Sequence, residues 1–133
     1  MERRYDPQPG IERFLAGTPL PLALAAVEEG ARITAEAGID ALRAKSVALL
    51  ELLVACLPAG VELASPRDPA LRGSHVAVRH PGARELTDDL IERCVVVDFR
   101  GPDVIRLGVA PLYTSFVDVW DAAQRLGEAM DAM

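Results

Sequence analysis

The residue best suited to chemistry in this chain is an arginine within an apolar segment that reads as a strand. Arg106 lies between Ile105 and Leu107. Burying a cation among such neighbours is costly unless an anion meets it, and the planar guanidinium fork matches a carboxylate bidentately, which an ammonium cannot do. Two interpretations stay open: Arg106 pairs with a nearby acid, Asp98 or Asp103, or it receives an anionic ligand. The ion pair is the more common arrangement for a charged residue in a strand.

Other reactive side chains are less favourable. Ser74 and His75 are adjacent, but neighbours on a strand point to opposite faces, so a nucleophile–base pair is not expected. His75 and His80 have no Cys or Glu at metal-ligand spacing nearby, which argues against a zinc site. Thr18 precedes Pro19 and suits the capping of a helix, although a helix N-terminus with a hydroxyl can also hold a phosphate.

The single lysine and the two cysteines receive ordinary interpretations. Lys45 lies in the middle of a predicted helix at a position that reads as exposed. A catalytic amine needs desolvation or a cationic neighbour to release its proton; Arg43 is near in sequence, but nothing indicates a pocket. We therefore expect a solvated lysine. Cys56 and Cys94 make no metal spacing, and we expect both to be small buried hydrophobic residues in a reducing compartment.

Length and composition exclude several classes of protein. A chain of 133 residues corresponds to about one domain, and its 50% hydrophobic and 26% charged residues are typical of globular proteins. The formal net charge of -6 argues against a nucleic-acid partner, because phosphate recognition needs a concentrated basic face. The N-terminus lacks the apolar run of a signal peptide, and no window reaches the roughly 18 apolar residues of a membrane span. We expect a cytoplasmic protein without a membrane partner.

The spacing of apolar residues and turn signals predicts the elements that position these side chains. Residues 1–18 read as an irregular connecting segment, and residues 19–133 as the folded domain. Helices are predicted from Thr18-Pro19 to Gly38, over 40–57, over 83–93 and from Ser115 onwards, where Asp118 makes an imperfect capping box; strands are predicted over 61–65, 75–79, 95–100 and 104–108. The order α-α-β-β-α-β-β-α predicts an α/β protein of the two-layer α+β type. Its small, mostly antiparallel sheet of about four strands has helices packed on one face.

Three blocks of sequence together resemble one known family. They are RFLAGTP (13–19), RGSHV (72–76), and DFRGPD (98–103) leading into IR (105–106) and APLYTSFVDV (110–119). In this combination they resemble the carboxy-terminal part of kynureninases, which are enzymes of the fold-type-I aminotransferase superfamily that use pyridoxal 5'-phosphate (PLP). The resemblance runs from about Tyr5 to the last predicted helix, and it implies the fold of the small domain of those enzymes.

The resemblance also implies a reaction and three site residues. Kynureninases hydrolyse L-kynurenine to anthranilate and L-alanine. In that family the arginine that matches Arg106 holds the α-carboxylate of the amino-acid substrate. The threonine that matches Thr18, with Gly17 before it, is similar to the one that reaches the cofactor phosphate of the neighbouring subunit. The resemblance therefore implies a homodimer.

The chain departs from the family pattern in one respect. The Schiff-base lysine, the residues that stack on the pyridine ring, their aspartate partner and most phosphate ligands belong to an upstream large domain in that family, and Lys45 does not match the context of the lysine. We therefore expect the small domain with its connecting segment, inactive alone and completed by the large domain or a second chain. A fragment, a truncated product and one half of a split enzyme all stay open.

A second class of hypothesis is a non-catalytic module that binds an anionic amino acid or regulates a partner. In either case a domain separated from a partner should expose apolar surface. We expect that surface along the first helix, at Leu20, Leu22, Leu24 and Val27, and over residues 109–113.

Overall fold

The computed structural model describes residues 6–15 and 17–133, which divide into two compact units. The division falls between Glu36 and Ala37. The boundary of the folded domain at residue 18, expected from the sequence, stays a prediction.

The first unit consists of a short 3-10 helix, η1 (Gly10–Phe14), and most of helix α1 (Pro21–Ala37). The prediction that this helix starts at Thr18-Pro19 with Thr18 as its cap is wrong, because the helix begins at Pro21. A residue before proline is disfavoured in the helical region, so Leu20 cannot belong to the first turn. Pro21 instead takes the first helical position, where no N–H is needed.

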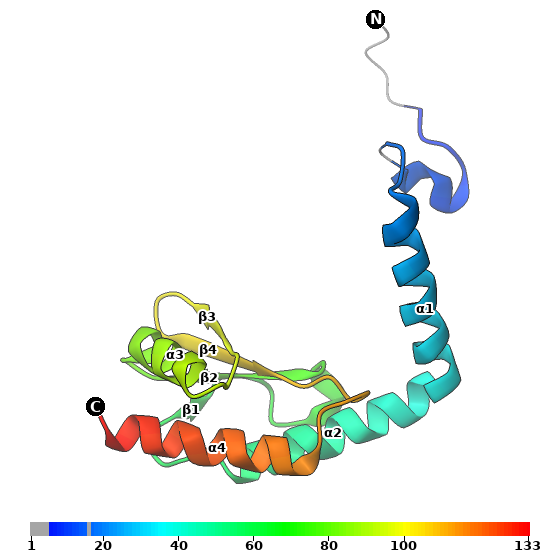
Figure 1. The fold of residues 1–133 in the computed structure, drawn as a ribbon. Coiled ribbons are helices and arrows are strands. Elements are labelled where there is room, and N and C mark those ends of the chain that lie inside the picture. The colour runs from blue at the N-terminus through cyan, green and yellow to red at the C-terminus, as the bar shows by residue number, and fades with distance from the viewer. Residues whose placement is uncertain (1–5, 16) are drawn as a thin grey trace, which may run out of the picture. The chain divides into compact units, whose positions relative to one another are not determined.

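The second unit contains all the other helices and strands that the structure describes (Figure 1). In chain order they are α2 (Ile39–Ala55), β1 (Glu62–Leu63), η2 (Pro69–Leu71), β2 (His75–Arg79), α3 (Ala83–Glu92), β3 (Asp98–Arg100), β4 (Val104–Gly108) and α4 (Phe116–Asp131). The strands form one antiparallel sheet in the order β1-β2-β4-β3. The predicted element order and the α+β class are confirmed.

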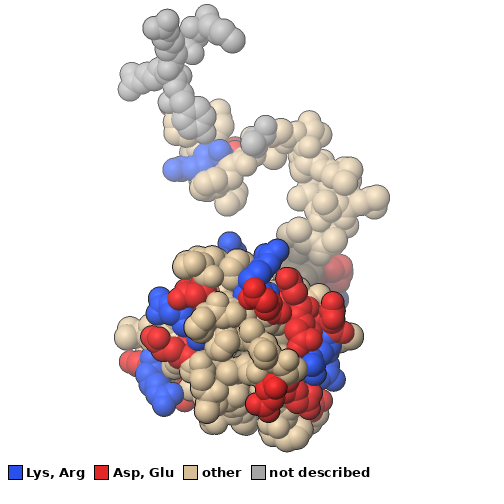
Figure 2. Space-filling view, turned by 90° about the vertical axis from the view of Figure 1, so that its left-hand side faces the viewer, with Lys and Arg blue, Asp and Glu red and all other residues tan. Residues whose placement is uncertain are grey.

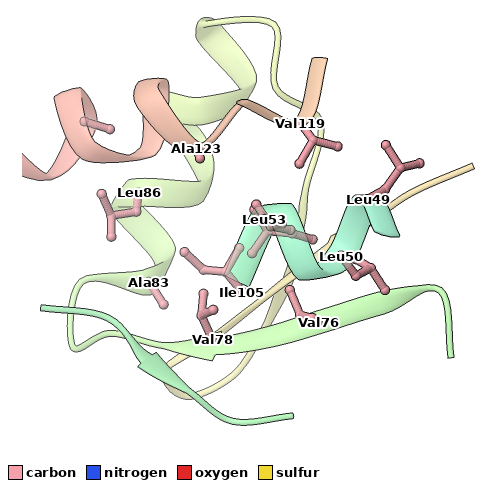
Figure 3. Close-up of a cluster of buried hydrophobic side chains, with 12 residues drawn as sticks. Leu49, Leu50, Leu53, Val76, Val78, Ala83, Leu86, Ile105, Val119 and Ala123 are labelled. Atoms are coloured by element: carbon pink, nitrogen blue, oxygen red, sulfur yellow. The ribbon is translucent and has the colours of Figure 1, made fainter. Parts of the chain in front are cut away.

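The core lies between one face of this sheet and the helices α2, α3 and α4. Strand alternation turns every second side chain toward the helices, and the helices present leucine and alanine to meet them (Figure 3). The main buried side chains are Leu49, Leu50, Leu53, Val76, Val78, Leu86, Leu90, Ile105, Leu107, Val119, Ala123 and Leu126. The other face of the sheet carries no helix of this unit.

Helix α4 begins with the capping box expected from the sequence. The Ser115 hydroxyl accepts a hydrogen bond from the Asp118 backbone N–H at 3.1 Å, and the Asp118 carboxylate accepts one from the Ser115 N–H at 2.7 Å. These two bonds satisfy amides that have no partner within the helix. They also hold the pKa of Asp118 below its usual range, chiefly through the Ser115 N–H.

The prediction that Cys94 is buried is wrong. Cys94 is exposed and has a φ of +62°, a left-handed conformation that favours glycine. It follows the last residues of α3, where the N–H of Val95 donates to the carbonyl of Leu90 at 2.8 Å and closes the helix. Because the Val95 amide ends the helix, the strand that was expected from residue 95 begins only at Asp98.

Candidate functional site

Arg106 lies on the face of the sheet that carries no helix of the second unit, called here the helix-free face. Its strand neighbours Ile105 and Leu107 are buried in the core, and alternation therefore turns Arg106 to the opposite side. Its side chain is 37% exposed. The expectation of a buried, desolvated cation is therefore wrong, because the Arg106 side chain is partly exposed to solvent.

Arg106 is paired with an acid on the adjacent strand. Asp98 of β3 lies directly opposite Arg106 of β4 in the sheet register. The Nε of Arg106 donates to Oδ2 of Asp98 at 2.8 Å, and Nη2 donates to the same oxygen. Of the two interpretations drawn from the sequence, the ion pair is the one that this chain forms, and Asp98 rather than Asp103 is the partner.

A second arginine contacts the same carboxylate. Arg100 lies two residues after Asp98, hence on the same face of β3, and its Nε donates to Oδ2 of Asp98 at 3.1 Å. The hydrogen bond from Arg106 is the main reason that the pKa of Asp98 is lowered, so this carboxylate is ionised at neutral pH. Two guanidinium groups and one carboxylate leave the group with a net charge of +1. The role of Arg100 was not predicted from the sequence, although its i, i+2 spacing from Asp98 is a usable signal.

One edge of the Arg106 guanidinium is open. Within residues 6–15 and 17–133, no acceptor contacts its Nη1 amino group. Two neighbouring positions on the same face carry little side chain: Ala77 lies opposite Arg106 on β2, and Gly108, with His75 opposite it, lies two residues further along β4. An anion can therefore approach the outer edge of the guanidinium from the solvent.

The other charged group on this face consists of one arginine and two acids that pair with it. Arg79 lies 3.5 Å from Glu62 and 3.5 Å from Asp103. These two acids and one base leave a net charge of -1, which does not favour an anion. The two charged groups therefore differ in sign, and the group with Arg106 is the one suited to a carboxylate.

Arg72, from the second block of the family resemblance, has a structural role. Its side chain is only 3% exposed and contacts Glu51 of α2. Its Nη1 also donates to the carbonyls of Pro66 and Arg67 at 3.1 and 3.0 Å. Arg72 thus ties the loop before β2 to α2. Sequence reasoning missed this role because the partner carbonyls depend on the path of the loop.

The serine of the same block also has a structural partner. The Ser46 hydroxyl, buried on α2, donates to the Ser74 hydroxyl at 2.8 Å, and His75 points to the helix-free face. As expected from strand alternation, Ser74 and His75 form no nucleophile–base pair.

The remaining candidates are Gly17, Thr18 and Lys45. Gly17 and Thr18 are exposed and belong to the first unit, whereas Arg106 belongs to the second. Lys45 lies on α2 and is partly buried rather than fully exposed as expected. In the described part of the chain, no acidic side chain pairs with it.

A separate cavity of about 410 Å³ lies on the other side of β4. Leu107, Val109, Tyr113 and the segment 94–97 line it together with α4. Arg106 is not part of its lining, so this cavity and the outward guanidinium are distinct features.

Charge on the surface is mixed. Figure 2 shows one face of the molecule, on which acidic and basic side chains lie next to one another around an uncharged centre. No described helix is long and apolar enough to cross a membrane.

Comparison with known proteins gives a consistent result. Residues 42–126 match the family model described as the kynureninase C-terminal domain. A kynureninase of Pseudomonas fluorescens is 43% identical over 136 residues, covering 98% of this chain and 33% of that relative. Kynureninases of Burkholderia mallei (strain SAVP1) and Burkholderia pseudomallei (strain K96243) are 40% identical, with the same shares covered. The chain spans about a third of the length of the curated relatives it matches.

Proposed function

The chain belongs to the kynureninase C-terminal domain family, and from this membership we propose that it is the small domain of a PLP-dependent hydrolase. The proposed reaction of the complete enzyme is the cleavage of L-kynurenine to anthranilate and L-alanine. The proposed contribution of this chain is Arg106, which binds the α-carboxylate of the substrate. The observation that carries the proposal is the open outer edge of the Arg106 guanidinium, within a group of net charge +1.

The chemistry of this edge suits the role. A guanidinium presents five N–H donors in a planar fork, and a carboxylate accepts two parallel hydrogen bonds from one edge of that fork. Such a contact fixes the direction of the substrate as well as its position. Holding the carboxylate end of an amino acid orients the bond to be broken relative to the cofactor, and orientation of this kind lowers the activation barrier.

The residues described here do not suffice to hold PLP. Thr18 offers one exposed hydroxyl, and a Cβ atom built at Gly17 would meet no atom within 4 Å. The only lysine, Lys45, lies along α2 and is not in the expected family context. PLP supplies the electron sink of the reaction when it is bound. We propose that its ring and Schiff-base lysine are held by the part of the enzyme that corresponds to the other two thirds of the relatives, with Gly17 and Thr18 contacting the phosphate of a neighbouring subunit.

The proposal includes partners and a location. The small domain works with the large domain, in one polypeptide or as a second chain, and the complete enzyme is a cytoplasmic homodimer. The 133-residue chain alone is inactive because it lacks a suitable lysine for the cofactor. Lys45 does not match the context of the Schiff-base lysine, and this favours one alternative for the chain by itself. In that alternative the chain is a non-catalytic module that binds an anionic amino acid.

The test of the proposed function uses the complete enzyme with substitutions at Arg106. We expect Arg106→Lys and Arg106→Ala to raise KM for L-kynurenine at least about 30-fold, since hydrogen bonds to a charged group contribute roughly 2 kcal/mol. Lysine keeps the charge but cannot present two parallel donors. Unchanged kinetic constants in both variants would rule out this role of Arg106.

A further inference from the structure

Asp98 occupies a particular edge of the guanidinium. An arginine can meet an anion along its inner edge, formed by Nε and Nη2, or along its outer edge, formed by Nη1 and Nη2. Asp98 takes the inner edge, because Nε at 2.8 Å and Nη2 both donate to its Oδ2. The outer edge is thereby left for another acceptor, and the arginine is held in a fixed direction.

We propose that Asp98 is a positioning residue that presents the outer edge of Arg106 to the substrate carboxylate. This inference rests on the proposed function of Arg106 and adds the group that aims it. A free arginine side chain has considerable rotamer entropy, and ordering it on binding opposes association. Asp98 removes part of this freedom before the substrate arrives, which is the energetic benefit of preorganisation.

Arg100 keeps the group attractive to an anion. A lone Arg–Asp pair is neutral and draws a carboxylate only weakly. Arg100 donates to the same oxygen of Asp98 at 3.1 Å, and the net charge of the three groups is +1. Its side chain is more exposed than that of Arg106, at 59% against 37%. Arg100 therefore balances the charge of Asp98 without occupying the outer edge of Arg106.

The face around Arg106 leaves space for the carboxylate. The position opposite it on β2 is Ala77, and the position two residues further along β4 is Gly108. A side chain built at Gly108 would meet Cβ of His75 at 3.8 Å and the carbonyl oxygen of Ser74 at 3.9 Å, which are ordinary contacts. The fold therefore tolerates alanine at Gly108.

The test compares Asp98→Asn with Asp103→Asn in the complete enzyme. Both substitutions remove one negative charge from the same face, but Asp103 contacts Arg79 instead of Arg106. If Asp98 positions Arg106, Asp98→Asn raises KM for L-kynurenine about tenfold and changes kcat less than about twofold, since a neutral amide oxygen holds the guanidinium less firmly than the carboxylate does and the effect acts on substrate binding. Asp103→Asn leaves both constants close to wild type.

Electrostatic attraction alone predicts that the KM of Asp98→Asn falls instead of rising. Removing Asp98 raises the net charge of the group from +1 to +2, so attraction alone lowers KM. A KM for Asp98→Asn that is equal to or below that of the wild type overturns the proposal, as does an equal rise in Asp103→Asn. Arg100→Gln provides a second variant: it lowers the net charge to zero, and we expect a KM rise of about two- to fivefold that shrinks at high salt. A salt-independent or absent effect overturns the role of Arg100.

The controls separate this inference from the proposed function. If Arg106→Ala raises KM and Asp98→Asn does not, Arg106 binds the carboxylate without help from Asp98. If Arg106→Ala leaves KM unchanged, the proposed function itself is wrong. Circular dichroism and thermal unfolding of each variant verify that the protein remains folded.

Discussion

Arg72 and Arg106, two of the four arginines in the family-like blocks, should respond differently to the same substitution. Arg72 is buried and hydrogen-bonded to two backbone carbonyls and a carboxylate, whereas Arg106 is half-exposed and paired with a half-exposed acid. Methionine keeps much of the length and volume of arginine but donates no hydrogen bond. We therefore expect Arg72→Met to destabilise the domain and Arg106→Met to leave its stability almost unchanged.

The magnitude at Arg72 follows from its contacts. Removing the guanidinium deprives the carbonyls of Pro66 and Arg67 of their donor, while the carboxylate of Glu51 is exposed enough to regain water. Hydrogen bonds from a charged donor contribute about 1.5 kcal/mol each, so two such bonds give a loss of about 3 kcal/mol. Stabilities of domains lie at about 5–15 kcal/mol, so the variant should still fold.

Urea unfolding of the 133-residue chain measures this difference. With an m-value of about 1–3 kcal/mol/M, a loss of 3 kcal/mol lowers the urea midpoint by about 1–3 M. Arg67→Met is the matched control, since the Arg67 side chain makes no ion pair with another described residue. Equal midpoints for Arg72→Met and Arg67→Met, or a larger loss in Arg106→Met, would refute the distinction between a structural and a functional arginine.

Three further predictions concern stability and association. Cys94→Gly should raise the free energy of unfolding by about 0.5–1 kcal/mol, because glycine relieves the positive φ; Cys94→Ala keeps the strain, and a thermal melt in which it gains as much would contradict this. Asp98 and Asp118 have lowered pKa values in the folded protein, so their contribution to stability is present above the pKa of the unfolded state and is lost as the pH falls below about 4. The urea midpoints at pH 7 and pH 3 should therefore differ less in an Asp98→Asn, Asp118→Asn double variant than in the wild type. An undiminished difference would count against this contribution. The apolar side chains of α1 are exposed as expected, with Leu22 at 80% and Val27 at 67%, so the chain should self-associate. The double substitution Leu22→Glu with Val27→Glu should shift sedimentation toward the monomer, whereas a substitution at exposed Glu28 should not.

Much of the fold was predictable because its signals are local. The apolar periods of 2 and 3.6 residues identify the strands and helices, and Ser115 with Asp118 marks the start of α4. The errors in the predicted element boundaries arise where one residue could belong to either of two elements. Val95 has a strong preference for a strand, but its amide completes the end of α3, and no local pattern decides between these uses.

The candidate site was predictable in part. The three blocks of sequence pointed to Arg106, and strand alternation between Ile105 and Leu107 contains the information that Arg106 faces away from the core. The choice of Asp98 over Asp103 depends on the register between β3 and β4, which requires the pairing of two strands. The contacts of Arg72 with Pro66 and Arg67 depend on a loop whose path has no periodic signal.

The most direct test of the central claim compares two ligands of the complete enzyme. One is L-kynurenine, and the other is the amine that differs from it only by loss of the α-carboxylate. We predict that Arg106→Ala weakens binding of L-kynurenine at least about 30-fold and leaves the inhibition constant of the amine unchanged. Equal weakening of both ligands, or of neither, would contradict a specific contact between Arg106 and the substrate carboxylate.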